Sequence, residues 1–212
     1  MPYDYKPFPY RSPPGLSEPE PRHPVVIVGA GPIGLALALD LAGRRQRVTV
    51  LDDNDVVSVG SRAICWSKRS LEILDRLGVG ERCVEKGVTW NSGRTFHRDA
   101  QVFDFDLLPE AGHKMPAFVN LQQYYVEEYL AEAALASPLV DLRFRNRVDV
   151  LSVEGDHVRM GVETPEGDYV LEATWLVACD GARSPVRQML GLDFAGELFE
   201  EHFLIADIEM EA

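Results

Sequence analysis

Residues 25–42 read VVIVGAGPIGLALALDLA, and the architecture of the chain can be worked out from this stretch. Its first four residues are Val and Ile, a run that is typical of a strand buried on both faces of a parallel sheet. A glycine-rich turn follows, and then an apolar helix that stops near Gly43. Residues 47–52 predict a second strand, so residues 24–52 form a βαβ unit.

The glycine turn has the spacing G-x-G-x-x-G, which is the fingerprint of a dinucleotide-binding site. In this chain it reads Gly29-Ala30-Gly31-Pro32-Ile33-Gly34. Gly29 permits the tight turn out of the strand, Gly31 leaves the backbone open to a pyrophosphate, and Gly34 lets the helix pack closely on the strand. The start of the helix adds free N–H groups and the positive end of its dipole. A glycine turn in another kind of α/β protein is the alternative.

Asp52 ends the second strand, where a carboxylate can accept hydrogen bonds from the ribose hydroxyls of a dinucleotide. We therefore predict that the ADP half of such a cofactor binds between the glycine turn and Asp52. Pro32, Ile33 and Asp53 are included among the predicted binding residues. This motif does not by itself distinguish NAD from FAD.

The composition narrows the class of protein. The 212 residues are 46% hydrophobic and 26% charged, as in an ordinary globular protein. The net charge of −13, from 34 acidic and 21 basic residues, argues against a nucleic-acid-binding surface and against docking on anionic lipid. The three cysteines are widely spaced, so no disulfide framework or zinc site is predicted, and a reducing, cytoplasmic setting fits best. A strand, a turn and a helix explain residues 25–42 better than a membrane span does.

The rest of the chain divides into an arm and further helices and strands. Residues 1–22 are rich in proline and lack the apolar core of a signal peptide, so we expect an irregular arm. Alternating apolar and polar residues predict a three-stranded meander at 148–153, 158–163 and 169–173. The other predicted elements are helices at 67–77, 120–136 and 184–190, and strands at 87–96, 101–105, 175–179 and 201–210.

Two further motifs are candidates for the site. Asp180 and Gly181 follow the buried strand 175–179, at the sheet edge where ligands of open α/β proteins bind, although a simple turn explains them equally well. Asn120 and Gln123 open a helix, and a capping box accounts for both residues without a ligand.

Arg62 is a weaker candidate by itself. A lone Arg is usually a solvated surface charge, but Arg62 comes soon after the strand that ends at Asp52, where a cofactor would pass. The five histidines are scattered along the chain. No metal site and no catalytic acid or base is predicted.

Taken in this order, the motifs resemble those of the flavoprotein aromatic hydroxylases, which are single-component FAD monooxygenases. Within them the chain looks most like relatives of 3-(3-hydroxyphenyl)propionate hydroxylase and phenol hydroxylase. The resemblance covers residues 24–210. It is carried by the stretches VVIVGAGPIGLALALDLA, SRAICWSKRSLEILDRLGVGE, NLQQYYVEEYL and ACDGARSPVRQMLGL.

The resemblance implies FAD as the cofactor and a role for single residues. The glycine turn and Asp52 would hold the ADP part of FAD, and Arg62 would approach the pyrophosphate and the flavin side. Gln123 would contact the cofactor. Asp180 and Gly181 belong to the family's second fingerprint, which is associated with FAD and with the use of NAD(P)H.

The resemblance also implies an activity. NAD(P)H would reduce FAD, and the reduced flavin would combine with O2 to give a C4a-hydroperoxide that hydroxylates a small, phenol-like aromatic substrate. The alternatives are another FAD-dependent dehydrogenase or reductase of the same fold, and an inactive FAD-binding fragment. A short-chain dehydrogenase ranks low, because no Tyr in the chain is followed by Lys four residues later.

Members of that family run to several hundred residues, so the resemblance implies that this chain is the N-terminal part of a longer enzyme. The predicted fold is α/β: a Rossmann-like FAD-binding domain with a parallel sheet and a β-meander crossover. We expect this domain over residues 23–191, with 84–118 extending toward the substrate side. Residues 192–212 would form the first strand of a truncated substrate-domain sheet. The missing C-terminal portion, or a second copy in a homodimer, would be the protein partner.

Overall fold

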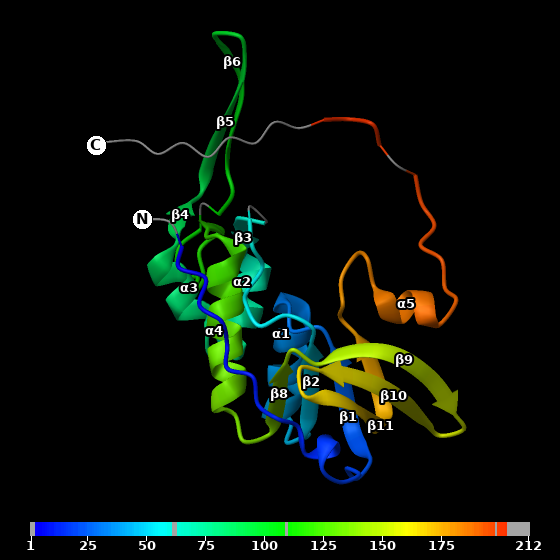
Figure 1. The fold of residues 1–212 in the computed structure, drawn as a ribbon. Helices are drawn as coiled ribbons and strands as arrows, with labels where there is room; N and C mark the ends of the chain where they lie inside the picture. Colours follow the sequence, from blue (N-terminus) through cyan, green and yellow to red (C-terminus); the bar gives the residue numbers. More distant parts are fainter. Residues whose placement is uncertain (1–2, 61–62, 109, 198, 203–212) are drawn as a thin grey trace.

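The fold is taken from a computed structural model of the chain, which describes residues 3–60, 63–108, 110–197 and 199–202 (Figure 1). The helices and strands follow one another in this order: a 3-10 turn Pro14–Leu16, β1 His23–Val28, α1 Pro32–Gly43, β2 Val48–Asp52, β3 Cys65–Ser67, α2 Lys68–Arg76, α3 Gly80–Lys86, β4 Val88–Trp90, β5 Ser92–His97, β6 Ala100–Asp106, β7 Phe118–Asn120, α4 Gln123–Ala136, β8 Val140–Phe144, β9 Arg147–Glu154, β10 His157–Thr164, β11 Gly167–Ala178 and α5 Pro185–Met189.

A six-stranded sheet forms the centre of the molecule, in the strand order β8-β2-β1-β11-β10-β9. The strands β8, β2, β1 and β11 pair in parallel. The strands β9, β10 and β11 pair antiparallel and form the meander. The predicted α/β fold with a parallel sheet and a meander crossover is therefore confirmed.

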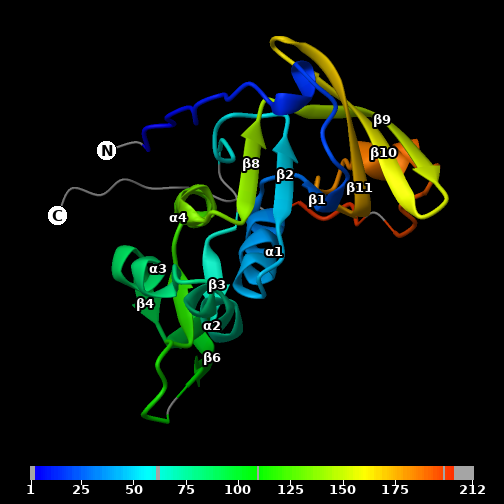
Figure 2. The ribbon, with the colours of Figure 1, turned by 90° about the horizontal axis from the view of Figure 1, so that it is seen from below.

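Two apolar layers hold this sheet in place, because successive side chains of a strand point to opposite faces. Ile27 of β1 and Val50 of β2 pack with helices α1 and α4 in one cluster. Their neighbours Val26 and Leu51 pack under the meander in a second cluster, with Met160 among others. Figure 2 shows α1 and α4 on one side of β1, β2 and β8, and the meander strands curving away on the other. All four of these β1 and β2 side chains are fully buried.

The last strand of the meander differs from the prediction. Residues 169–173 and 175–179 were expected as two strands, but β11 runs without a break from Gly167 to Ala178. Its first half pairs with β10 and its second half with β1, with Ala173 at the junction of both ladders. The residue pattern changes there because the partner strand and the packing change, while the backbone continues in the same extended conformation.

The predicted helix at 120–136 begins three residues late. Asn120 ends the short strand β7, and α4 starts at Gln123 with Gln122 at its N-cap position and no side-chain cap. The capping-box interpretation of Asn120 is therefore wrong. The physical reason is that the Asn120 side-chain oxygen already accepts hydrogen bonds from Trp90 Nε1 at 2.8 Å and Cys65 Sγ at 3.2 Å.

Several short elements had no clear signal in the sequence. The strands β3 and β7, the helix α3 and the edge strand β8 were not predicted. The strand expected at 87–96 is in fact two strands in different sheets: β4 pairs with β7, and β5 pairs with β6. The β5–β6 hairpin extends far from the rest of the molecule (Figure 1). Most of the strand expected at 201–210 lies outside the described residues.

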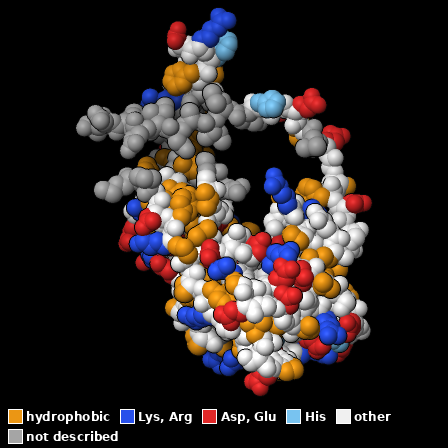
Figure 3. All heavy atoms as spheres, in the orientation of Figure 1, with side chains coloured by type: hydrophobic (Ala, Val, Ile, Leu, Met, Phe, Trp, Pro, Cys, Tyr) orange, Lys and Arg blue, Asp and Glu red, His pale blue; other side chains and the backbone are white. Residues whose placement is uncertain are grey.

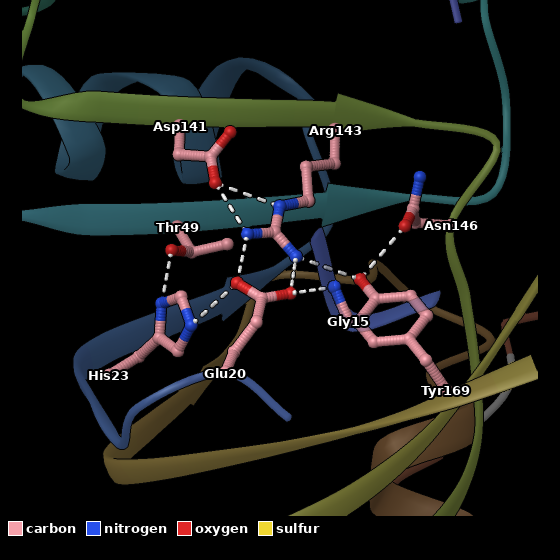
Figure 4. A network of polar contacts seen from close by, with 8 residues as sticks. All are labelled: Gly15, Glu20, His23, Thr49, Asp141, Arg143, Asn146 and Tyr169. Atoms are coloured by element: carbon pink, nitrogen blue, oxygen red, sulfur yellow. Dashed lines mark hydrogen bonds and ion pairs between the residues drawn. The ribbon is translucent and has the colours of Figure 1, made fainter. Parts of the chain in front are cut away.

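The N-terminal arm lies against the domain along much of its length. Phe8 stacks on Phe144 of β8 with ring centroids 4.6 Å apart, and its backbone N–H donates to Asp55 O at 2.6 Å. Further along, Arg143 of β8 donates hydrogen bonds to both carboxylate oxygens of Glu20, at 2.7 and 2.8 Å. Figure 4 shows how Arg143 also reaches Asp141 and Tyr169 within this network. The arm is therefore attached by a stacked ring pair and by a buried ion pair.

Candidate functional site

A cavity of about 530 Å³ opens at the carboxyl ends of β1, β2 and β11. Small-molecule sites have volumes of roughly 300–1,000 Å³, and in open α/β sheets they lie at this edge. The cavity brings together nine of the predicted residues: Gly29, Gly31, Pro32, Ile33, Asp52, Asp53, Gln123, Asp180 and Gly181. Gly34 does not line it, and Arg62 lies outside the described residues.

The three glycines of the turn are required for different physical reasons. Gly29 has φ +106°, and a Cβ on it would lie 2.4 Å from the carbonyl oxygen of Cys179. A Cβ on Gly34 would lie 1.9 Å from the carbonyl oxygen of Gly29. These two glycines therefore allow the helix, the turn and the end of β11 to approach each other closely.

Gly31 is different from the other two glycines. Its backbone conformation is open to any residue, and a Cβ on it would meet no described atom within 4 Å. Neither the fold nor the packing requires glycine at this position, which faces the cavity. A glycine here instead lets a ligand come close to the backbone at the start of α1, where N–H groups of the first helical turn lack intrahelical partners.

Asp52 joins the end of β2 to the glycine turn. One carboxylate oxygen accepts a hydrogen bond from the backbone N–H of Ala30, and the other accepts from Asn54 N at 2.8 Å. Burial raises the pKa of Asp52, and these two hydrogen bonds partly offset that rise. A carboxylate has about four acceptor positions, so Asp52 can also accept hydrogen bonds from ligand hydroxyls.

The turn after β11 fits both interpretations that the sequence left open. Asp180 accepts a hydrogen bond from Val186 N at 3.0 Å, and Ser184 Oγ accepts from Arg187 N at 3.0 Å. These side chains cap the start of α5, with Ser184 at the N-cap position. Gly181, with φ +82°, makes the turn itself, and both Asp180 and Gly181 line the cavity.

Sequence reasoning missed several residues of the cavity wall. Asn54, Ser58, Asn146 and Arg147 also line it. Asn146 follows β8 and donates its backbone N–H to Asp52 O at 2.8 Å, but β8 was not predicted as a strand, so no pattern placed it at the sheet edge. Arg147 is a basic group on the wall, and it pairs with Glu163. If β8 had been predicted as a strand, Asn146 and Arg147 would have been placed just after its carboxyl end, at the edge of the sheet where the cavity lies.

Gln123 enters the cavity from the start of α4 and is held by a buried acid. Its Nε2 donates to Glu127 Oε1 at 2.6 Å. Glu127 also accepts hydrogen bonds from Ser58 N and Ser58 Oγ, at 2.6 and 2.8 Å. The i, i+4 spacing of Gln123 and Glu127 on one helix face was the available signal for this contact.

The described part of the chain contains no group of three His, Cys, Asp or Glu side chains that could hold a metal ion. Within the same residues, no helix is long and apolar enough to cross a membrane. The three cysteines are free thiols, and Cys179 lines the cavity.

Comparison with protein families gives one match that spans most of the chain. Residues 22–212 match the family described as "FAD binding domain". The arm before residue 22 is outside this match. Among curated proteins, para-nitrophenol 4-monooxygenase from Pseudomonas sp. strain WBC-3 is 30% identical over 187 residues, which cover 87% of this chain and 46% of that protein.

A second curated relative is 12-dehydrotetracycline 5-monooxygenase/anhydrotetracycline 6-monooxygenase from Streptomyces rimosus, 36% identical over 186 residues, which cover 88% of this chain and 36% of that protein. Among solved structures, p-nitrophenol 4-monooxygenase from Pseudomonas putida DLL-E4 superimposes with a TM-score of 0.77 at 31% identity, covering 83% of this chain and 45% of that one. The chain thus spans less than half the length of each of these relatives.

Proposed function

Because the chain belongs to the FAD binding domain family, we propose that it is the FAD-binding part of a monooxygenase that hydroxylates a phenol-like compound with NAD(P)H and O2. The observation that carries the cofactor assignment is the open space at Gly31, next to the first turn of α1, in a cavity that Asp52 also lines. The substrate class is supported by the relatives, which act on nitrophenol and on tetracycline intermediates.

The residues of the cavity fit the ADP half of FAD. The start of α1 would bind the pyrophosphate through backbone N–H groups, and Asp52 would accept hydrogen bonds from the ribose. Gln123 would contact the cofactor from α4, while Asp180 and Gly181 would bound it at the end of β11. We assign Arg62 to the pyrophosphate on the family resemblance alone. Bound FAD would accept a hydride from NAD(P)H and activate O2.

In the complete enzyme this chain would bind and orient the cofactor and exclude water around it. A reducing compartment that supplies NAD(P)H, such as the cytoplasm, is the setting we propose. Contact with the substrate would come mainly from sequence beyond this chain, because the match covers only 46% and 36% of these two relatives.

We propose that the β5–β6 hairpin extends toward that substrate side. Its large apolar side chains Phe96, Val102 and Phe103 are exposed. Figure 3 shows hydrophobic side chains on the hairpin and on the part of the body below it. A two-stranded hairpin is marginal alone in water, so a further strand from the rest of the protein, or from a second copy, would stabilise it.

The cofactor assignment is tested with Gly31→Ala. The added methyl group enters the cavity without a clash in the protein, so we expect an unchanged melting temperature and an FAD affinity at least about tenfold weaker, or ~1.4 kcal/mol. FAD binding is measured by titration, followed through quenching of flavin fluorescence. Gly43→Ala is the matched control, because a Cβ there also meets no described atom within 4 Å but lies at the far end of α1. Equal affinities for both variants would contradict the assignment.

The reaction is tested on the full-length protein with a panel of phenols. We expect a suitable phenol to stimulate NAD(P)H oxidation and to yield a hydroxylated product. A protein that binds FAD but oxidises NAD(P)H without oxygenated product from any phenol would favour a dehydrogenase or reductase of the same fold. A protein that binds FAD but oxidises no NAD(P)H with any phenol would favour an inactive FAD-binding role.

A further inference from the structure

Glu127 is a buried acid that the proposed function does not use. It lies in the second turn of α4 and is only 3% exposed. None of the described Lys, Arg or His residues forms an ion pair with its carboxylate at 4 Å or less. Burying a carboxylate is costly unless hydrogen bonds compensate for the lost water, so the donors around it are significant.

Three donors surround this carboxylate, and all belong to residues that line the cavity. They are Ser58 N at 2.6 Å, Ser58 Oγ at 2.8 Å and Gln123 Nε2 at 2.6 Å. Ser58 lies on the loop 53–60 after β2, and Gln123 lies at the start of α4. Glu127 itself does not line the cavity. Its hydrogen bonds connect two parts of the cavity wall, the loop 53–60 and the start of α4, on the side away from the cavity.

The chemistry of a carboxylate fixes how Gln123 presents its amide. A carboxylate only accepts hydrogen bonds, so the NH2 group of Gln123 must face Glu127. The amide oxygen and the second N–H then remain for a ligand. The same carboxylate accepts a hydrogen bond from the Ser58 hydroxyl, which fixes the rotation of that hydroxyl.

We propose that Glu127 is a positioning residue for the cofactor: it sets the Gln123 amide and the 53–60 loop before FAD binds. Such preorganisation raises affinity, because the ordering of the wall does not have to occur on binding. This inference rests on the proposed function, because FAD is the ligand in question. It adds a residue that acts through Gln123 and Ser58 without contact to the cofactor.

The variant Glu127→Gln has nearly the same shape but carries an NH2 group. That group would face the N–H donors of Ser58 or Gln123, so at least one of the three hydrogen bonds is lost. We expect FAD affinity to fall about tenfold. Amide hydrogens of the 53–60 loop should exchange faster in the FAD-free protein. Glu132→Gln is the matched control, because Glu132 is an exposed acid on the same helix that pairs with Arg82; it should change neither measurement.

A double-mutant cycle distinguishes positioning from a general loss of stability. If Glu127 acts through Gln123, then Glu127→Gln weakens FAD binding less than about threefold in a Gln123→Ala background. A purely structural role would give the same fold-loss of FAD affinity in both backgrounds. That outcome, in which the two losses multiply independently, would overturn the proposal. Should Glu127→Gln fail to fold, Ser58→Ala removes one donor and leaves the carboxylate bonded to two others. It should weaken FAD binding and speed loop exchange, and no effect on either would overturn the proposal.

The outcomes separate this inference from the proposed function. Tight FAD binding by the wild-type protein and by Glu127→Gln alike would overturn the inference and leave the function intact. A wild-type protein that does not bind FAD would overturn the function, and with it the cofactor role of Glu127. Loop exchange is measured without FAD, so it reports on the contact with Ser58 in either case.

Discussion

Glu20 shows how one side chain can attach a whole segment. Its carboxylate is almost fully buried between Arg143 and His23, and it also accepts a hydrogen bond from Gly15 N at 3.0 Å. Burial by itself would raise the pKa of Glu20. The hydrogen bonds and charge of Arg143 outweigh that effect and hold the pKa below its ordinary value of 4.5. The ion pair is therefore formed with Glu20 ionised.

This arrangement predicts a specific pH dependence. Glu20→Gln should lower the free energy of unfolding by about 2 kcal/mol at neutral pH, because Arg143 loses a charged partner. Since the folded pKa is depressed, the stabilisation by Glu20 is present above the unfolded value and is lost as pH falls through the folded value. Urea unfolding of both proteins from pH 7 downward measures the difference. The exposed Glu18→Gln is the control, and a difference that persists unchanged well below pH 4 would contradict the mechanism.

The N-terminal arm, residues 1–22, is attached near the candidate cavity by the ring of Phe8. The rings of Phe8 and Phe144 are nearly parallel, with 5° between their planes, and the neighbouring hydrogen bond to Asp55 holds the loop that carries Ser58. Phe8 precedes residues 22–212, the part of the chain that matches the family. Its contacts with Phe144 and Asp55 are therefore made from outside the matched domain.

Phe8→Ala should lower the free energy of unfolding by about 2 kcal/mol, because it removes the stacked pair and leaves space over β8. Thermal unfolding followed by circular dichroism measures the loss. Phe96→Ala is the control, because Phe96 is an exposed aromatic residue on the β5–β6 hairpin and should change stability by less than ~0.5 kcal/mol. Equal effects of the two substitutions would show that the arm is not held by its ring.

Elements with a strong local pattern were predictable, and those defined by distant partners were not. The strand before Gly29, the turn and α1 follow from local residue types: a run of Val and Ile, the glycine spacing, and an apolar run that stops near Gly43. The strands β3 and β7 have three residues each, which is too short for a period to be visible. The continuity of β11 depends on β1 and β10 together, and no local pattern carries that information.

For the whole molecule, the candidate site illustrates the same limit. The glycine turn and Asp52 were predictable because they lie within one βαβ unit. Asn146 lies at the end of a strand and Ser58 lies on a loop, and the position of both depends on the complete sheet. The position of the long connection between β2 and α4 does not follow from sequence either, yet it starts in the cavity wall at Asp53 and leads to Gln123, which also lines the cavity.

The pairing of β1 with β11 has a consequence for how the chain is made. Partners such as Val28 and Ala178 are 150 residues apart. At a synthesis rate of about 5–20 residues per second, roughly 8 to 30 seconds pass before β11 can reach the nascent β1. During that time Val26 and Ile27, fully buried in the finished protein, belong to a strand with one edge unpaired. The ribosome-bound chain therefore exposes an unpaired strand edge that is prone to aggregation. We expect chaperones that bind nascent chains to bind this edge of β1.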